Sequence, residues 1–169
     1  LAMIPTYIEI DRVVPRNQPV IVMDAGGTNF RVAVVTFRDD GAADISDLRV
    51  HSMPGIEREI NRDAFFAAMA AYVQDLADRS EHIGFCFSYP VEMFPDKDGR
   101  VLYFSKEIKA PEVVGQLIGA GLGGALSLLG SKHKKRIVLL NDTVATLLAG
   151  RVDATGRTYD SYIGFILGT

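Results

Sequence analysis

The sequence holds little cysteine, little excess charge of either sign and no long apolar run. Its one cysteine, Cys86, excludes an intramolecular disulfide and a metal cluster of thiolates. The net charge of −3 argues against a general nucleic-acid binder, which would carry a basic patch. No apolar run is long enough to span a membrane, and charges from Glu9 onward interrupt the core that a signal peptide needs. We therefore expect a soluble cytoplasmic protein without nucleic-acid or membrane partners.

The composition is that of a folded domain. The chain has 169 residues, of which 48% are hydrophobic and 23% are charged, which suffices for one hydrophobic core. Residues 1–19 show no periodicity and contain three prolines, so we expect a connector that leads into the domain. Cys86 lies in the apolar run 83–87 and is predicted to be a core residue rather than a nucleophile.

The first half of the domain has the pattern of three strands, a helix and a buried strand. Residues 61–79 predict the helix, because apolar side chains recur at three- and four-residue steps and Asn61 can cap the first turn. The run 83–89 is apolar on both faces, as a buried strand should be. The three earlier strands are predicted at 20–24, 30–37 and 45–53, joined by tight turns.

The second half alternates helical and extended patterns. Asp98-Gly99 predicts the turn of a short hairpin, and Pro111 begins an apolar stripe of helical spacing that continues to Gly130. The remaining elements are expected to be a strand at 137–140, a helix at 144–152 and a strand at 159–167. The pattern by itself indicates an α/β fold.

A glycine-rich stretch within that apolar stripe offers an alternative. Residues 119–124 match the pattern G-x-G-x-x-G, and Asp142 lies eighteen residues beyond Gly124, near where a dinucleotide site places its ribose acid. A Rossmann dinucleotide-binding domain would require residues 113–118 to form a strand. Pro111 and the four-residue apolar spacing instead favour one continuous helix, and a lone glycine fingerprint has many false matches.

The turn between the first two predicted strands combines an acid with glycines and small polar residues. Paired glycines allow positive φ and let a ligand approach the backbone, and consecutive N–H groups can form an anion site. A carboxylate beside a bound phosphate is most simply explained by Mg²⁺ between them. The sequence therefore predicts phosphate binding here rather than a bare hairpin turn. The residues concerned are Asp24, Gly26, Gly27, Thr28, Asn29 and Arg31.

A second polar pair, Asn141 and Asp142, follows the short strand predicted at 137–140 and precedes a helix. Asn and Asp commonly cap helices, and residue types alone favour that structural role. An acid fixed at a strand end can also face a cleft and act as a general base.

Five stretches in the same order resemble the hexokinase family. They are the turn at 24–32; Phe-Cys-Phe-Ser-Tyr-Pro at 85–90, similar to the family's Phe-Ser-Phe-Pro sugar-binding loop; Phe-Ser-Lys-Glu-Ile-Lys at 104–109, similar to Trp-Thr/Ser-Lys-Gly-Phe-Lys; Asn-Asp-Thr-Val at 141–144; and the start of a second phosphate segment at 163–169. Tyr89 replaces the more usual Phe, Phe104 replaces Trp and Glu107 replaces Gly.

The resemblance implies a role for each matching residue. Asp142 would be the catalytic base that accepts the proton of the sugar 6-hydroxyl. Lys106 would contact the hexose and offset charge on the transferring phosphoryl group. The other hexose contacts would be Ser88, Ser105 and Asn141, and Gly168 and Thr169 would open the second phosphate segment.

The resemblance also implies a fold and an activity. The fold would be ribonuclease H-like (the actin-like ATPase fold), with a mixed sheet flanked by helices. Residues 20–140 would form the small lobe, 141–169 would begin the large lobe, and 1–19 would connect from a helix upstream. The activity would be transfer of the ATP γ-phosphoryl group, with Mg²⁺, to the 6-hydroxyl of a hexose such as glucose, the first step of glycolysis.

Two further expectations accompany this function. An isolated chain of 169 residues should be inactive, because the large lobe would be incomplete. The alternative is a sugar-sensing module of the same fold that binds hexose without turnover. Retention of Asp24, Lys106 and Asp142 favours the enzyme, because a sensor could lose its base.

Overall fold

A five-stranded mixed sheet organises the chain, with strand order β3-β2-β1-β4-β7. The computed structural model describes residues 5–9, 14–104, 107–152 and 160–166. The strands of this sheet are β1 (Pro19–Ala25), β2 (Asn29–Phe37), β3 (Ala43–Ser52), β4 (His82–Phe87) and β7 (Arg136–Leu140). β5 (Val91–Met93) and β6 (Gly99–Val101) form a separate antiparallel pair, which confirms the hairpin predicted at Asp98-Gly99.

The sheet combines an antiparallel meander with parallel strands. β1, β2 and β3 are antiparallel neighbours, whereas β4 pairs with β1 and β7 pairs with β4 in parallel. The parallel strands therefore end at the same edge of the sheet. The order of three strands, a helix and a buried strand agrees with the prediction, and so do the positions of β1, β2, β3, β4 and β7 to within a few residues.

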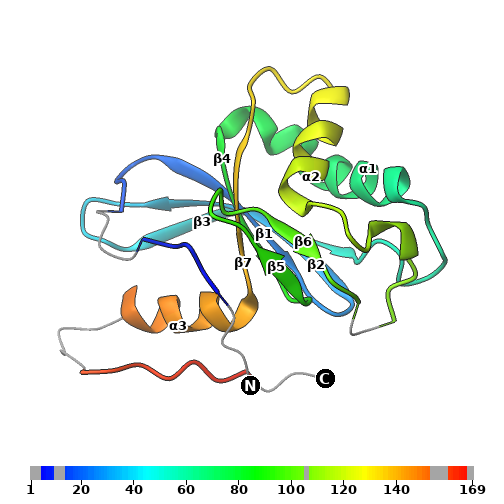
Figure 1. Ribbon diagram of the computed structural model, residues 1–169. Coiled ribbons are helices and arrows are strands. Elements are labelled where there is room, and N and C mark those ends of the chain that lie inside the picture. The colour runs from blue at the N-terminus through cyan, green and yellow to red at the C-terminus, as the bar shows by residue number, and fades with distance from the viewer. Residues whose placement is uncertain (1–4, 10–13, 105–106, 153–159, 167–169) are drawn as a thin grey trace.

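Helices cover both faces of the sheet (Figure 1). α1 (Arg62–Val73) and α2 (Ile118–Leu128) lie together on one face, and α3 (Asp142–Val152) lies on the other. Met23, Phe85 and Phe87 are completely or almost completely buried, because alternate residues of β1 and β4 project toward the core. Asp24 and Cys86 belong to the opposite, partly open face.

The helix predicted at 61–79 is confirmed as α1, followed directly by a 3₁₀ helix, η1 (Gln74–Arg79). The Asn61 side chain accepts a hydrogen bond from the Ala64 N–H at 2.8 Å, which is the predicted N-cap. Phe65, Met69 and Val73 recur at four-residue spacing and are fully buried, so the predicted apolar stripe is the face that packs on the sheet and α2.

The continuous helix predicted from Pro111 to Gly130 is wrong in its first part. Pro111–Val113 form a 3₁₀ turn, η2, and α2 begins only at Ile118. Between them Gly115 has a φ of +84°, a left-handed conformation that ends the helical path. The Gly115 N–H donates instead to the Val101 carbonyl at 2.8 Å, so the β6 strand competes with the helix for this backbone.

The strand predicted at 159–167 is also wrong for the residues that the structure describes. Residues 160–166 have no strand hydrogen bonding, although Figure 1 shows them extended along α3. Gly164 lies against this helix, and a Cβ atom built on it would be 3.2 Å from the Leu147 nitrogen. The segment packs on a helix and pairs with no described strand. Its composition of residues common in strands is therefore not enough to form a strand here.

We predict opposite effects on stability from two glycines of α2. A Cβ on Gly121 would lie 2.3 Å from the Phe66 ring, whereas a Cβ on Gly124 would meet nothing within 4 Å. Gly121→Ala should lower the free energy of unfolding by roughly 1–3 kcal/mol through overpacking. Gly124→Ala should raise it by up to about 1 kcal/mol through helix propensity. Urea unfolding of both variants measures this, and equal effects would contradict the packing described.

Candidate functional site

The ends of β1, β4 and β7 bring together residues that are far apart in the sequence. Asp24 is paired with Cys86 across β1 and β4, and Cys86 is paired with Leu140 across β4 and β7. Asp142 follows Leu140 by two residues at the start of α3. Since ligands of open α/β sheets bind at the carboxyl ends of parallel strands, this edge is the candidate site.

The thiol of Cys86 lies near both predicted acids, Asp24 and Asp142. Burial is the main cause that raises the pKa of its thiol, and the negative charges of Asp24 and Asp142 raise the pKa further, to about 12. Hydrogen bonding toward Asp24 adds to this rise in the pKa, whereas hydrogen bonding toward Ser88 lowers the pKa. Asp24 and Asp142 therefore flank one half-buried thiol, and the prediction that Cys86 is a simple core residue is only partly correct.

The turn at residues 26–28 joins β1 to β2 and exposes backbone donors. The Gly26 N–H donates to the Asn29 carbonyl at 3.0 Å, and the Met53 N–H donates to the Thr28 carbonyl at 2.8 Å. Among the described residues, no acceptor is found for the N–H groups of Gly27 and Thr28. Two neighbouring free donors are what an anion site requires.

This turn does not use the positive φ that its paired glycines allow. The described glycines with left-handed φ values are Gly41, Gly55, Gly115 and Gly130. At Gly26, a Cβ would lie 3.3 Å from the Asn29 carbonyl oxygen, which is tighter than an ordinary contact. The absence of a side chain here serves close packing of the turn on itself.

Asp24 and Arg31 form an ion pair across the base of the turn. The Arg31 Nη1 donates to the Asp24 Oδ2 at 2.8 Å, and their side chains are 47% and 38% exposed. An ion pair this exposed contributes little stability, so either group can exchange its partner for a ligand. No cluster of three His, Cys, Asp or Glu side chains that could hold a metal occurs in the described parts of the chain.

Asn141 and Asp142 are held by the first turn of α3. The Asn141 Oδ1 accepts from the Thr143 N–H at 3.0 Å and from the Thr143 hydroxyl at 2.5 Å. The Asp142 Oδ1 accepts from the same Thr143 N–H at 2.8 Å. The capping role that residue types favour therefore falls to Asn141. In the described part of the chain, the second carboxylate oxygen of Asp142 has no hydrogen-bond partner, so it can take another one.

Ser88 and Tyr89 follow β4 and touch the turn. The Ser88 N–H donates to the Ala25 carbonyl at 3.1 Å. The Tyr89 hydroxyl donates to the Gly26 carbonyl at 2.6 Å, and the ring is fully buried. From the sequence, Tyr89 is expected only to replace the Phe that is more usual at this position. The hydroxyl of a tyrosine in this apolar run is itself a signal of a hydrogen bond, because a buried tyrosine hydroxyl usually has a hydrogen-bond partner.

Four predicted site residues lie outside the described part of the chain: Ser105, Lys106, Gly168 and Thr169. Phe104, just before two of them, packs against Tyr89 with ring centroids 5.1 Å apart and against Phe65 at 5.9 Å. The described end of this segment is thus anchored beside the candidate site.

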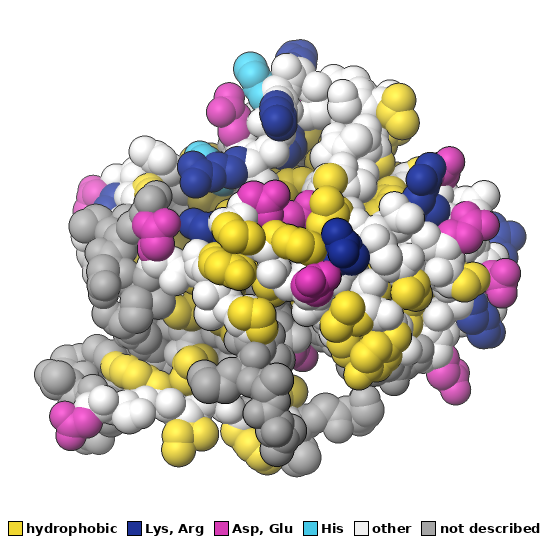
Figure 2. Space-filling model, in the orientation of Figure 1, with side chains coloured by type: hydrophobic (Ala, Val, Ile, Leu, Met, Phe, Trp, Pro, Cys, Tyr) yellow, Lys and Arg dark blue, Asp and Glu magenta, His cyan; other side chains and the backbone are white. Residues whose placement is uncertain are grey.

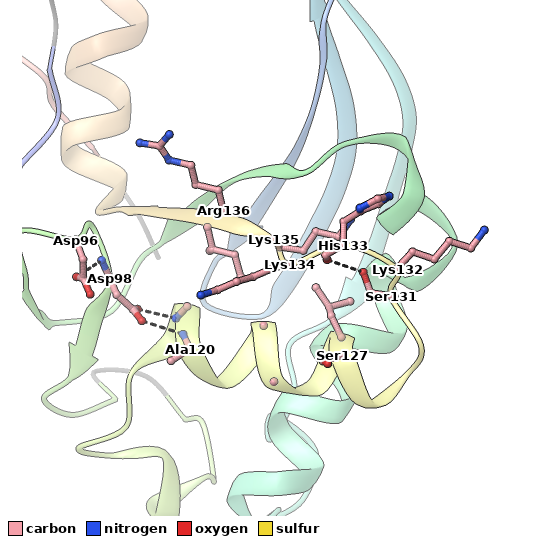
Figure 3. A pocket seen from close by; sticks show the side chains of 15 residues that line it. Asp96, Asp98, Ala120, Ser127, Ser131, Lys132, His133, Lys134, Lys135 and Arg136 are labelled. Carbon is pink, nitrogen blue, oxygen red and sulfur yellow. Dashed lines mark hydrogen bonds between the residues drawn. The ribbon is translucent and has the colours of Figure 1, made fainter.

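A pocket of about 910 Å³ lies elsewhere, between α2 and the connector to β7 (Figure 3). It meets β7 at Arg136, the end opposite Asp142. At its floor the Asp98 carboxylate accepts from the N–H groups of Gly119 and Ala120, at 2.6 and 2.8 Å. The glycine fingerprint is inside a helix whose first donors already bind a carboxylate. The dinucleotide-binding alternative is therefore wrong.

The basic connector beside this pocket is bound to η1 and to the residues that follow η1. Figure 2 shows its Lys and His side chains at the top of the molecule. Lys132 pairs with Asp78 and His133 pairs with Glu81. Lys135 is buried and donates to the carbonyls of Ala77 and Ser80, so it ties the connector to η1.

No described helix is long and apolar enough to cross a membrane.

We predict that Cys86 resists alkylation. Since its pKa is raised from the ordinary 9.0 to about 12, iodoacetamide at pH 8 should react roughly 1,000-fold more slowly than with an unperturbed thiol. The rate should rise with pH and show no plateau below pH 10, because the thiolate fraction is still increasing. Asp24→Asn, which removes one of the charges, should react faster. Mass spectrometry measures the alkylation rate. A rate that reaches a plateau near pH 9 would contradict this environment of the thiol.

Comparison with known proteins gives one consistent family. A family model described as Hexokinase matches residues 1–152. The chain is 28% identical to Hexokinase-1 of Schizosaccharomyces pombe over 174 residues, which cover 99% of this chain and 35% of that protein. It is 31% identical to Hexokinase-7 of Oryza sativa subsp. japonica over 158 residues, which cover 87% of this chain and 33% of the relative.

Solved structures agree on the fold. A hexokinase from Schistosoma mansoni complexed with glucose has a TM-score of 0.70 at 23% identity, covering 82% of this chain and 32% of its own. A second hexokinase crystal structure has a TM-score of 0.65 at 20% identity, covering 86% and 34%. The predicted ribonuclease H-like, actin-like ATPase fold is confirmed. The chain spans about a third of the length of these relatives, and within that span it belongs to the hexokinase family.

Proposed function

We propose that the protein containing this chain transfers the γ-phosphoryl group of ATP to the 6-hydroxyl of a hexose. The observation that carries the proposal is the convergence of Asp24, the free amides of the turn and Asp142 around Cys86 at one sheet edge. Phosphoryl transfer needs a phosphate cradle, a base and donors that position the acceptor. Membership of the hexokinase family makes hexose the acceptor class to test, with glucose first because a glucose complex exists among the structural relatives.

In this proposal the turn after β1 binds the nucleotide phosphates. The N–H groups of Gly27 and Thr28 would donate to phosphate oxygens, with Asn29 and Arg31 beside them. Gly26 would let the turn close tightly, and Gly168 and Thr169 would add a second phosphate segment. Asp24 fits a Mg²⁺ ion held mainly by the phosphates, because it offers one exposed carboxylate next to free amides. Mg²⁺ would supply charge neutralisation during transfer, and Arg31 would then leave Asp24 for a phosphate.

The hexose would lie between the loop after β4 and the start of α3. Asp142 would accept the 6-hydroxyl proton through its uncommitted carboxylate oxygen, a role worth about 10²–10⁴ in rate. The side-chain carbonyl oxygen of Asn141 accepts the hydrogen bonds of the helix cap. The amide NH₂ of Asn141 would therefore be the group that donates to the sugar. Ser88, Ser105 and Lys106 would complete the hexose contacts, with Lys106 also facing the transferring phosphoryl group.

We further propose the lobe division that the resemblance implies. Residues 20–140 would be the small lobe, 141–169 the first part of the large lobe and 1–19 the connector into the domain. α3 begins at Asp142, so the proposed base lies at the junction between lobes. Closure of two lobes would exclude water and align the groups, and the 169-residue chain alone should therefore lack turnover.

We predict that Asp142→Ala in the full native polypeptide lowers kcat by about 10²–10⁴-fold, because the base is lost. Hexose affinity should stay within a few fold. The measurement is a coupled assay of hexose-dependent ADP formation together with calorimetric hexose binding. Asp63→Ala is the matched control, because Asp63 is also an acid in the first turn of a helix but is 82% exposed and pairs with Arg62.

The outcomes separate the candidate functions. Unchanged kcat in Asp142→Ala would mean that the base is misassigned. Hexose binding without ADP formation in the unmodified protein would instead support the sugar-sensing module. An equal loss of activity in Asp63→Ala would indicate a general structural effect of removing a helix-terminal acid.

A further inference from the structure

Tyr89 makes a contact that links the two halves of the candidate site. Its hydroxyl donates to the Gly26 carbonyl at 2.6 Å, across 63 residues of sequence. The ring is fully buried and packs between Phe87, with centroids 5.0 Å apart, and Phe104, at 5.1 Å. Burial also raises the pKa of the phenol above its ordinary value of 10.0, so the hydroxyl remains a donor at neutral and moderately alkaline pH.

The direction of the Gly26 carbonyl determines the direction of the next N–H group. A trans peptide is planar, so its C=O and its N–H point to opposite sides; the structure contains no cis peptide among its described residues. The Gly26 carbonyl points toward the buried phenol. The Gly27 N–H therefore points away from the core, and it has no acceptor among the described residues.

The other contacts of the turn leave this peptide unconstrained. The Gly26 N–H bond to the Asn29 carbonyl holds the preceding peptide, and the Met53 N–H bond to the Thr28 carbonyl holds the peptide between Thr28 and Asn29, two positions further on. Rotation of the peptide between Gly26 and Gly27 depends on one torsion of each glycine, and neither glycine has a Cβ to restrict that torsion. Without the phenol, the peptide could turn its carbonyl outward at little steric cost, and a carbonyl oxygen would repel a phosphate.

We propose that Tyr89 is a positioning residue that holds the Gly26–Gly27 peptide with the Gly27 N–H directed at the bound nucleotide phosphate. The proposal rests on the function proposed above. Tyr89 itself touches neither substrate; it acts through the peptide. Since Ser88 directly precedes it and donates its own N–H to Ala25, the proposed hexose loop and the phosphate turn are fixed to each other at two points.

The test compares Tyr89→Phe with Tyr72→Phe in the full native polypeptide. Tyr72 is the matched control, because its hydroxyl also donates to a backbone carbonyl, that of Ser52, at 3.1 Å, and not to the Gly26–Gly27 peptide. Loss of one hydrogen bond predicts that Tyr89→Phe raises the KM for ATP and the Kd of magnesium AMP-PNP about five- to tenfold. The KM for hexose should change less than twofold. Tyr72→Phe should leave all three constants unchanged.

Amide NMR of the unmodified protein provides a second readout that needs no variant. Magnesium AMP-PNP should shift the Gly27 amide proton downfield, and the shift should be smaller in Tyr89→Phe. An unshifted Gly27 amide in the unmodified protein would overturn the proposal, as would equal effects of Tyr89→Phe on the KM of ATP and of hexose. Binding of AMP-PNP that depends on Tyr89 but comes without ADP formation would leave this inference standing while the proposed function fails.

Discussion

Parallel pairing of β1, β4 and β7 is the constraint on which the rest of the structure depends. Since parallel strands end at the same edge, the registers Asp24–Cys86 and Cys86–Leu140 place the turn after β1, the loop after β4 and the start of α3 beside one another. The burial of Met23, Phe85 and Phe87 under α1 and α2 fixes which face each strand turns inward. A one-residue slip in β4 would move Cys86 into the core and separate the polar groups.

The sheet edge combines rigid backbone with loosely held charges. The turn is held by a backbone bond from Gly26 to the Asn29 carbonyl, by a bond from the Met53 N–H and by the Tyr89 phenol, whereas the Asp24–Arg31 ion pair is exposed and weak. A phosphate site benefits from this division, because fixed N–H groups need no reorganisation and an exposed ion pair can rearrange around a ligand. The α2 pocket differs in both respects, since Asp98 already occupies its helix donors and two of its basic side chains are paired.

Local pattern sufficed for the five strands of the main sheet, the cap at Asn61 and the order of the elements up to α3, because apolar periodicity and capping chemistry act over a few residues. Local pattern failed where contacts with residues distant in the sequence determine the backbone conformation. Gly115 bonds to β6 and interrupts the predicted helix, and the 160–166 segment lies on α3 without pairing. The site residues could be chosen from motifs, but the Tyr89–Gly26 bond joins positions whose proximity only the folded sheet creates. Ser105, Lys106, Gly168 and Thr169 stay predictions.

Locating the metal–nucleotide complex on the protein tests whether the turn after β1 binds the nucleotide phosphates. In the complex with AMP-PNP, Mn²⁺ can replace Mg²⁺. Because Mn²⁺ is paramagnetic, it broadens the NMR signals of nearby amides. We predict that the amides of residues 24–29 broaden first, followed by those at 141–143. Broadening centred on residues 119–124 of α2, with the turn unaffected, would contradict it.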